Sequence, residues 1–339
     1  MSIPGIIIPS TEDSKIFLSY YNETLVRSVG NSKMILKFGG TAKLLGGEKP
    51  NYSNLAPKVL FYSARGPDPQ DNSFRNADIM KPNLIAPGNL IWGAWSSLAT
   101  DSPEFSGENF AMISGTSMAA PHIAGLAALI KHKYPSFGPS AIASALSTTA
   151  TLFDTEGGHI MAQRMYTHPD TTQTPATPFD MGSGFVNATA ALDPGLIFYS
   201  SFDDYMSFLC AINGSAPVIS NYTGYDCGRV TTTMDGADLN LPSIMVSSLN
   251  QTRTISRRVK NIGDRNETYG VTWSPPDGVS VKVTPSKFFI MTGETRNLTV
   301  RLTATVNSSS ASFGRIGFYG NRGHVSNVQV SVISKTTYI

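Results

Sequence analysis

A serine stands between small residues just ahead of a long apolar run, in the stretch SGTSMAAPH. The run that follows predicts a helix over Ser117–Lys131, in which Pro121 is tolerable because it lies near the helix start. At the first turn of a helix, a serine hydroxyl and its backbone N–H lie beside the positive end of the helix dipole. That position suits a nucleophile of acyl transfer, whose oxyanion the N–H stabilises. The alternative is that Thr116 or Ser117 only caps the helix.

A nucleophilic serine needs a general base, and the histidines are the first candidates. His122 follows the serine by five residues, which on a helix is about 140° of rotation and about 7.5 Å of rise. Its ring is therefore expected to point away from the serine hydroxyl and to serve packing. His132 lies at the far end of the same helix, and His159, His168 and His324 occur in no recognisable base motif.

The carboxylates nearest upstream do not supply the missing partner either. Asp68, Asp71 and Asp78 lie in a Pro-rich stretch, where aspartates commonly form turns, so we expect them to be solvated or turn-forming. The sequence thus offers a candidate nucleophile without an identifiable base.

The elements around the serine follow from periodicity and turn residues. Ahead of it we predict strands over 5–8, 33–40 and 58–64, a helix over 14–26, and a buried strand over 82–88 that continues into residues 91–97. The Ser117 helix is apolar nearly all round, so it is expected to lie inside a domain. After it we predict a helix over 140–149 capped by Ser140, a short helix within 180–196 and another over 200–210.

From about Leu239 the period of the apolar residues changes to two. Seven strand candidates follow at short spacing with turn signals between them, which is the pattern of an independent β-sandwich; they span 244–249, 254–263, 268–276, 279–290, 296–304, 312–320 and 324–333. Val279, Val281 and Val283 are expected to face inward.

Composition narrows the class of protein. The chain has 339 residues, 41% hydrophobic and 15% charged, with a net charge of +2, so it is globular and long enough for two or three domains. It contains no run of five Lys or Arg and no window of about 18 apolar residues. We therefore expect no nucleic-acid partner and no membrane span, and the sequence shows no cofactor or metal motif.

The cysteines Cys210 and Cys227 are either free core thiols or a disulfide. Acceptor motifs for N-glycosylation favour the secretory pathway, where disulfides also form; they lie at Asn22, Asn51, Asn187, Asn213, Asn221, Asn250, Asn266, Asn297 and Asn307. A bridge closing this short loop would contribute about 3 kcal/mol. The N-terminal residues do not read as a signal peptide, so we expect the secretory signal in sequence that precedes residue 1.

The full stretch GTSMAAPHIAGLAALI resembles the serine motif of subtilisin-like proteases. The phrases YSARGPDP, KPNLIAPGNLIWGAW, GSGFVNATAALDPGL and FDDYMSFLC narrow the resemblance to the plant subtilases. It implies the end of a protease-associated insertion over 1–30, part of an α/β catalytic domain with a parallel sheet over 31–200, a connector over 201–238 and a fibronectin type III-like sandwich over 239–339.

The same resemblance implies that Ser117 is the nucleophile of a serine endopeptidase, with its own N–H as an oxyanion donor and a protein or peptide as substrate. It raises the expectation of a Cys210–Cys227 disulfide and of secretion to the apoplast or cell wall. The stretch around 83–88 is expected to contribute to the remaining cleft.

The departures from the family pattern decide what the chain itself can do. In the family the triad runs Asp, His, Ser along the chain, and the Asp and His segments belong before the point where this sequence begins. We expect the chain as printed to be inactive. The alternative reading is a non-catalytic secreted glycoprotein that acts as a binding module through its sandwich.

Overall fold

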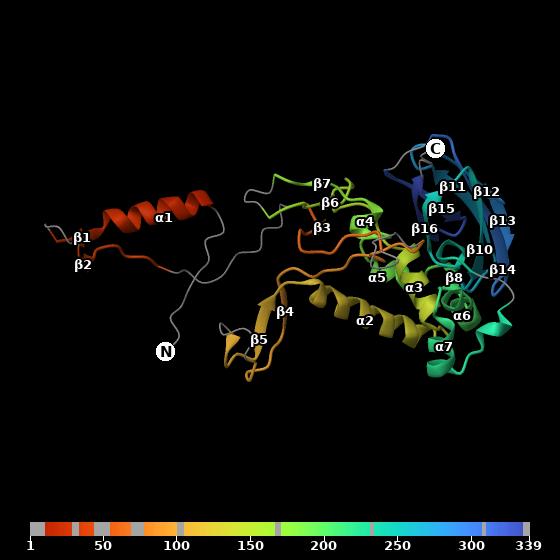
Figure 1. Cartoon of the computed structure of the whole chain (residues 1–339), viewed down its shortest axis with the longest axis horizontal. Helices are drawn as coiled ribbons and strands as arrows, with labels where there is room; N and C mark the ends of the chain where they lie inside the picture. The colour runs from red at the N-terminus through yellow and green to blue at the C-terminus, as the bar shows by residue number, and fades with distance from the viewer. Residues whose placement is uncertain are drawn as a thin grey trace.

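The computed structural model describes the chain in eight stretches: 11–28, 34–43, 55–68, 78–99, 105–166, 171–230, 234–306 and 310–334. Figure 1 shows three regions: a small N-terminal unit standing apart, a central region of helices and short strands, and a β-rich C-terminal region. The strand predicted over 5–8 lies outside the described residues.

The N-terminal unit is a helix followed by a hairpin. Helix α1 (Thr11–Glu23) leads into strand β1 (Leu25–Arg27), which pairs antiparallel with β2 (Ile35–Phe38). The prediction that the helix reaches Val26 is wrong, because the chain turns at Thr24. The Thr24 hydroxyl donates to the Tyr21 carbonyl, the Thr24 carbonyl accepts from Gly39 N–H at 3.0 Å, and Leu25 then pairs with the second strand.

The central region is built around two helices. Its elements are β3 (Lys58–Val59), β4 (Ile91–Ala94), β5 (Phe110–Ile113), α2 (Thr116–Lys133), α3 (Pro139–Thr148), β6 (Met161–Ala162), β7 (Thr174–Pro175), α4 (Pro178–Met181) and α5 (Ala188–Ala191). Strands β3 and β6 pair in parallel, and β7 pairs antiparallel with β6. The β3–β6 pair and one parallel bridge between Ile85 and Phe185 make up the parallel β structure of this region in the described residues.

Helix α2 is covered on one side only. Ile130 is its one buried residue, whereas Leu129 on another face is 53% exposed. Ile123 and Leu126 pack against a small core that α3 shares. The prediction that this helix lies wholly inside a domain is therefore wrong for this chain, since the described elements cover a single face of it.

Two further sequence predictions fail in this region. Helix α3 begins at Pro139 after Gly138, so Ser140 does not cap it; the Ser140 hydroxyl instead accepts from the Ser200 N–H at 2.9 Å. The stretch 82–88 is not a buried strand, because only Ile85 forms a bridge there. The residues after it form the hairpin β4–β5, whose Trp92 and Phe110 rings are exposed and stacked.

The C-terminal region is a two-sheet sandwich. Its strands are β9 (Ser243–Leu249), β10 (Thr252–Asn261), β11 (Glu267–Ser274), β12 (Val279–Thr284), β13 (Lys287–Ile290), β14 (Thr295–Ala304), β15 (Ala311–Gly320) and β16 (Val325–Ser334). The stretch 279–290, predicted as one strand, divides at Pro285, which has no N–H for the ladder. Val279, Val281 and Val283 are buried as predicted.

One strand of the sandwich comes from far upstream. The sheet orders are β12-β14-β10-β8 and β13-β11-β15-β16-β9. Strand β8 (Leu196–Phe198) precedes β9 by more than forty residues, yet it pairs antiparallel with β10 and places Leu196 and Phe198 in the sandwich core. The segment that follows the central helices is thereby built into the sheet β12-β14-β10-β8.

The sandwich and the central region share polar contacts as well. Asp78 accepts from the Ser247 N–H and hydroxyl at 2.6 Å and pairs with Arg253 at 2.9 Å. The prediction that Asp78 is solvated or turn-forming is therefore wrong; Asp71 lies outside the described residues. On the other side of the junction, His324 contacts the buried Glu267 at 2.7 Å and Asp193 at 3.4 Å.

The connector carries the predicted disulfide. Helices α6 (Phe202–Ala211) and α7 (Ala216–Thr223) and the short helix η2 (Cys227–Arg229) form it, and the Cys210–Cys227 bridge joins α6 to η2 with a Cα–Cα distance of 5.5 Å. Of the nine glycosylation motifs, Asn51 and Asn307 lie outside the described residues. The other seven asparagines are exposed. Within the described stretches, no helix combines the length and apolar character that crossing a membrane requires.

Candidate active site

Ser117 is the second residue of α2. The chain leaves β5 at Ile113, passes through extended backbone at Gly115 and enters the helix at Thr116. Gly115 is the cap residue, and no side chain caps the turn. The interpretation of Thr116 or Ser117 as a cap is therefore wrong, and the exposed Ser117 hydroxyl is left free for another use.

The turn in front of the serine is held by a second loop that must contain glycine. The Gly115 N–H donates to the Gly88 carbonyl at 2.8 Å, and the Leu90 N–H donates to the Ser114 hydroxyl at 2.7 Å. A Cβ at Gly88 would lie 2.8 Å from the Gly115 carbonyl oxygen and 3.1 Å from the Ala119 Cβ. The loop approaches the helix so closely that a side chain at position 88 would push the serine turn aside.

Tyr62 lies against the same loop. Its hydroxyl donates to Asn89 Oδ1 at 3.2 Å and lies 3.4 Å from the Gly88 carbonyl. Burial raises the pKa of Tyr62, and a hydrogen bond with Ser114 opposes that rise. The phenol is therefore neutral near pH 7 and acts as a donor that fixes the loop preceding the nucleophile turn.

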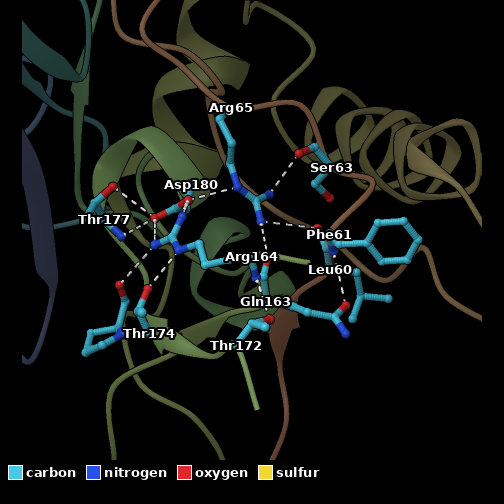
Figure 2. A network of polar contacts seen from close by, with 11 residues as sticks. Leu60, Phe61, Ser63, Arg65, Gln163, Arg164, Thr172, Thr174, Thr177 and Asp180 are labelled. Carbon is cyan, nitrogen blue, oxygen red and sulfur yellow. Dashed lines mark hydrogen bonds and ion pairs between the residues drawn. The ribbon is translucent and has the colours of Figure 1, made fainter. Parts of the chain in front are cut away.

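The stretch that carries Tyr62 is anchored by a buried carboxylate. Asp180, 2% exposed, contacts Arg164 Nη1 at 2.5 Å and Arg65 Nε at 2.9 Å, and accepts from the Thr177 N–H at 2.7 Å. Figure 2 shows the two guanidinium groups meeting at this carboxylate. Burial alone would raise the pKa of Asp180, but hydrogen bonds from Arg164 and Thr177 outweigh it and hold that pKa below its usual value.

Arg65 links Asp180 to the segment that contains Tyr62. Its guanidinium donates to the carbonyls of Leu60 at 3.2 Å, Ser63 at 2.9 Å and Gln163 at 2.9 Å, as Figure 2 shows. The Leu60 and Ser63 carbonyls lie on either side of Tyr62 in the chain. A chain of contacts thus runs from Asp180 through Arg65 to Tyr62 and on to the loop that supports the serine.

No histidine in the described part of the chain hydrogen bonds the Ser117 hydroxyl. His122 Nδ1 bonds the Met118 carbonyl at 2.8 Å, so its ring turns back onto its own helix. That helix leaves His122 and His132 exposed. His159 lies beside Phe153, and His324 belongs to the sandwich junction; His168 lies outside the described residues.

A cavity of about 600 Å³ borders the serine turn. Gly115, Thr116 and Ala119 line it from the helix side, and Leu84–Gly88, Tyr62 and Val59 from the opposite side. The wall from 84 to 88 is the stretch that the sequence pointed to as part of the cleft. Most of the lining is apolar. On α2 the cavity is lined by Thr116, Ala119, Ala120 and Ile123, and Ser117 itself is not among the lining residues.

This geometry supplies part of an acyl-transfer site. The first N–H groups of a helix have no intrahelical acceptor, and the Ser117 N–H has none among the described residues. Such a free donor beside a nucleophile can stabilise an oxyanion. Acyl transfer at a serine also requires a general base, because an unassisted hydroxyl is a weak nucleophile.

The fold and the site together define a class: an α/β segment that presents a serine at the first turn of its main helix, joined to a β-sandwich. Comparison with known proteins agrees with that class. The Subtilase family model matches residues 10–184, and a Fibronectin type-III domain model matches residues 238–332. The chain belongs to the subtilase family, and the fold predicted from the sequence is confirmed.

Individual relatives extend over nearly the whole chain. Subtilisin-like protease SBT2.3 of Arabidopsis thaliana is 63% identical over 335 residues, which are 99% of this chain and 40% of the relative. Subtilisin-like protease SBT2.2 of the same plant is also 63% identical, over 99% of this chain and 39% of the relative. CO(2)-response secreted protease, again from Arabidopsis thaliana, is 34% identical over 93% of this chain. The chain spans about two fifths of the length of these proteins.

Proposed function

We propose that Ser117 is the nucleophile of a subtilisin-type serine endopeptidase, whose general base and orienting carboxylate come from polypeptide outside this sequence. The hydroxyl attacks the scissile carbonyl, the Ser117 N–H donates to the resulting oxyanion, and an acyl-enzyme forms as the amine leaves. The base takes the serine proton and returns it to the leaving amine.

The observation that carries this proposal is the unused first turn of α2. Ser117 neither caps the helix nor bonds a described side chain, while Gly88, Leu90 and Tyr62 hold the turn in place. The cavity beside the turn gives a peptide room to lie along the Leu84–Gly88 stretch.

The 339-residue chain alone is expected to have no measurable peptidase activity. In bacterial subtilisin, a relative of this family, removing the histidine costs about as much as removing the whole triad, roughly a millionfold in rate. Exposed glycosylation motifs and the disulfide support a secreted protein of the apoplast or cell wall. The substrate is a protein or peptide; nothing in the site selects a particular sequence.

The test joins this chain to the part of SBT2.3 that the match does not cover. The hybrid is expected to cleave a generic protein substrate such as casein, and S117A should abolish that cleavage. S136A, at an exposed serine beyond the far end of α2, is the matched control and should cleave like the parent hybrid. Full activity of S117A would refute the assignment.

A further inference from the structure

The outer face of the sheet β12-β14-β10-β8 carries positive charge and hydroxyl groups. On β10, β12 and β14 alternate residues point outward, and the register places them side by side. We name this surface the cationic face, after its charged residues Arg258, Lys260, Lys282 and Arg301, all of them exposed. The other outward residues of these three fully described strands are Ser, Thr and Asn297, and none is acidic.

Two of these cations stand directly opposite each other. Lys282 of β12 pairs in register with Arg301 of β14, and neither forms an ion pair with a described residue. Like charges at opposite positions of neighbouring strands repel. The sheet therefore holds an unneutralised pair of positive charges on strands about 4.8 Å apart.

The remaining cations extend the charge along the sheet. Lys260 also has no acidic partner among the described residues. Arg258 has one, Asp204 of α6 at 2.8 Å. The positive charge thus runs from the β12 edge across β14 to β10, and Asp204 offsets it at one end only.

We propose that the cationic face binds an extended polysaccharide that bears carboxylate groups. Charge complementarity selects a polyanion, because exposed cations with no protein counterion attract repeated negative charge. The Ser and Thr hydroxyls between the cations can donate to and accept from sugar hydroxyls, as Thr252 and Thr303 do with each other at 3.1 Å. Strand β12, which carries Lys282, is the edge strand of this sheet.

The composition of the face argues against two other polyanions. Proteins that bind single-stranded nucleic acids stack the bases on aromatic side chains, and the outward positions of β10, β12 and β14 carry no aromatic residue. Proteins that lie on anionic membranes insert apolar side chains below the headgroups, and these positions carry no large apolar residue either.

Asn297 lies on the same face and begins a glycosylation motif. It is four residues from Arg301 along β14, which is about 13 Å. A glycan there would border the Lys282–Arg301 pair, so N297Q should bind a polysaccharide as tightly as the parent chain or more tightly. Weaker binding by N297Q would show that the glycan, and not the cations, holds the ligand, and would overturn the proposal.

The main test measures binding of the full 339-residue chain to polygalacturonate in a low-salt buffer, for example by biolayer interferometry. Saturable binding is expected that weakens as NaCl is raised, because added salt screens exposed charges. The double charge reversal K282E/R301E should bind about tenfold more weakly, since each exposed ion pair contributes up to a few-fold in affinity. Fully methyl-esterified polygalacturonate, which has the same backbone without the charge, should not bind.

The matched control is R229E/R265E, which changes the net charge equally at two exposed arginines off the cationic face. It should bind polygalacturonate like the parent chain, and thermal melting should show that both double variants remain folded. Equal loss in both doubles would mean that net charge alone drives binding. Unchanged binding of K282E/R301E, or tighter binding to single-stranded DNA or phosphatidylserine vesicles than to polygalacturonate, would each overturn the proposal.

Discussion

Replacing Asp180 by Asn tests the anchor beneath the nucleophile loop. The carboxylate is 3% exposed, and its partners Arg65 and Arg164 are 24% and 37% exposed. Removing one member of a fully buried ion pair costs about 3–5 kcal/mol, because the other charge stays buried without a partner. Water reaches Arg164 in part, so we expect the low end, about 3 kcal/mol, which corresponds to a fall in melting temperature of roughly 6–12 °C.

Calorimetry should measure the thermal unfolding of D180N and of the control variant D226N under the same conditions. Asp226 is 63% exposed and pairs with an arginine that is 84% exposed, so its loss should change stability by under about 0.5 kcal/mol. Because the pKa of Asp180 is lowered in the folded chain, its stabilisation is complete above the unfolded value of about 3.9 and is lost as pH falls through the folded pKa.

The difference in free energy of unfolding between the parent chain and D180N should therefore be constant near neutral pH and should vanish as pH drops below about 4. If D180N is less stable than the parent chain by under about 1 kcal/mol at pH 7, Arg65 and Arg164 find other partners. A gap that persists unchanged in acid would show that shape rather than charge is responsible. Either result would refute the anchoring role.

Three other predictions concern the connector and the sandwich. Breaking the Cys210–Cys227 bridge by serine substitution should lower the free energy of unfolding by about 3 kcal/mol, and reduction should raise the intact mass by that of two hydrogen atoms. Two free thiols in secreted protein would contradict the pairing. Burial lowers the pKa of His324, but hydrogen bonds and charges of the neighbouring carboxylates more than compensate, so its pKa is raised. The stabilisation from this histidine is complete below the unfolded pKa of about 6.5 and is lost as pH rises through the folded pKa. H324Q should therefore be destabilised at pH 5 and less so at pH 9, and a pH-independent effect would contradict this. A fragment 193–339, which retains β8, should melt higher than a fragment 239–339, because the shorter one keeps the pairing of β10 with β14 but loses its pairing with β8 and the core residue Leu196. Equal melting temperatures would show that β8 contributes nothing.

Local patterns in the sequence were enough to predict much of the fold. The alternation of Val279, Val281 and Val283 marks a strand with one buried face, and that signal lies within six residues. The helix start at Ser117 is likewise a local signal, correct to within one residue. The expectation of the disulfide and the role proposed for Ser117 came from resemblance to a family rather than from spacing.

Features that depend on distant pairing could not be predicted. Strand β8 is three residues long and is defined only by its pairing with β10. Asp180 meets Arg65 across more than a hundred residues of chain, and no local pattern marks a carboxylate for that partner. The solvated role expected for Asp78 failed for the same reason, since its partners Ser247 and Arg253 lie on the sandwich.

The cationic face illustrates the same limit for surfaces. Charge runs along the sequence gave no sign of a polyanion site, because Lys282 and Arg301 are separated along the chain and meet only through the strand register. The exposed faces of α2 are a similar case. Its composition predicts burial, yet the described elements cover only the side that packs on α3.

We have proposed that Ser117 is a subtilisin-type nucleophile whose base lies outside this sequence. Labelling with a fluorophosphonate probe, followed by peptide mapping, tests it most directly, because the probe modifies serines that a base activates. We expect no adduct on the 339-residue chain alone and an adduct on Ser117 when the chain is joined to the uncovered part of SBT2.3. Labelling of the isolated chain, or an adduct on any other residue of the hybrid, would contradict it.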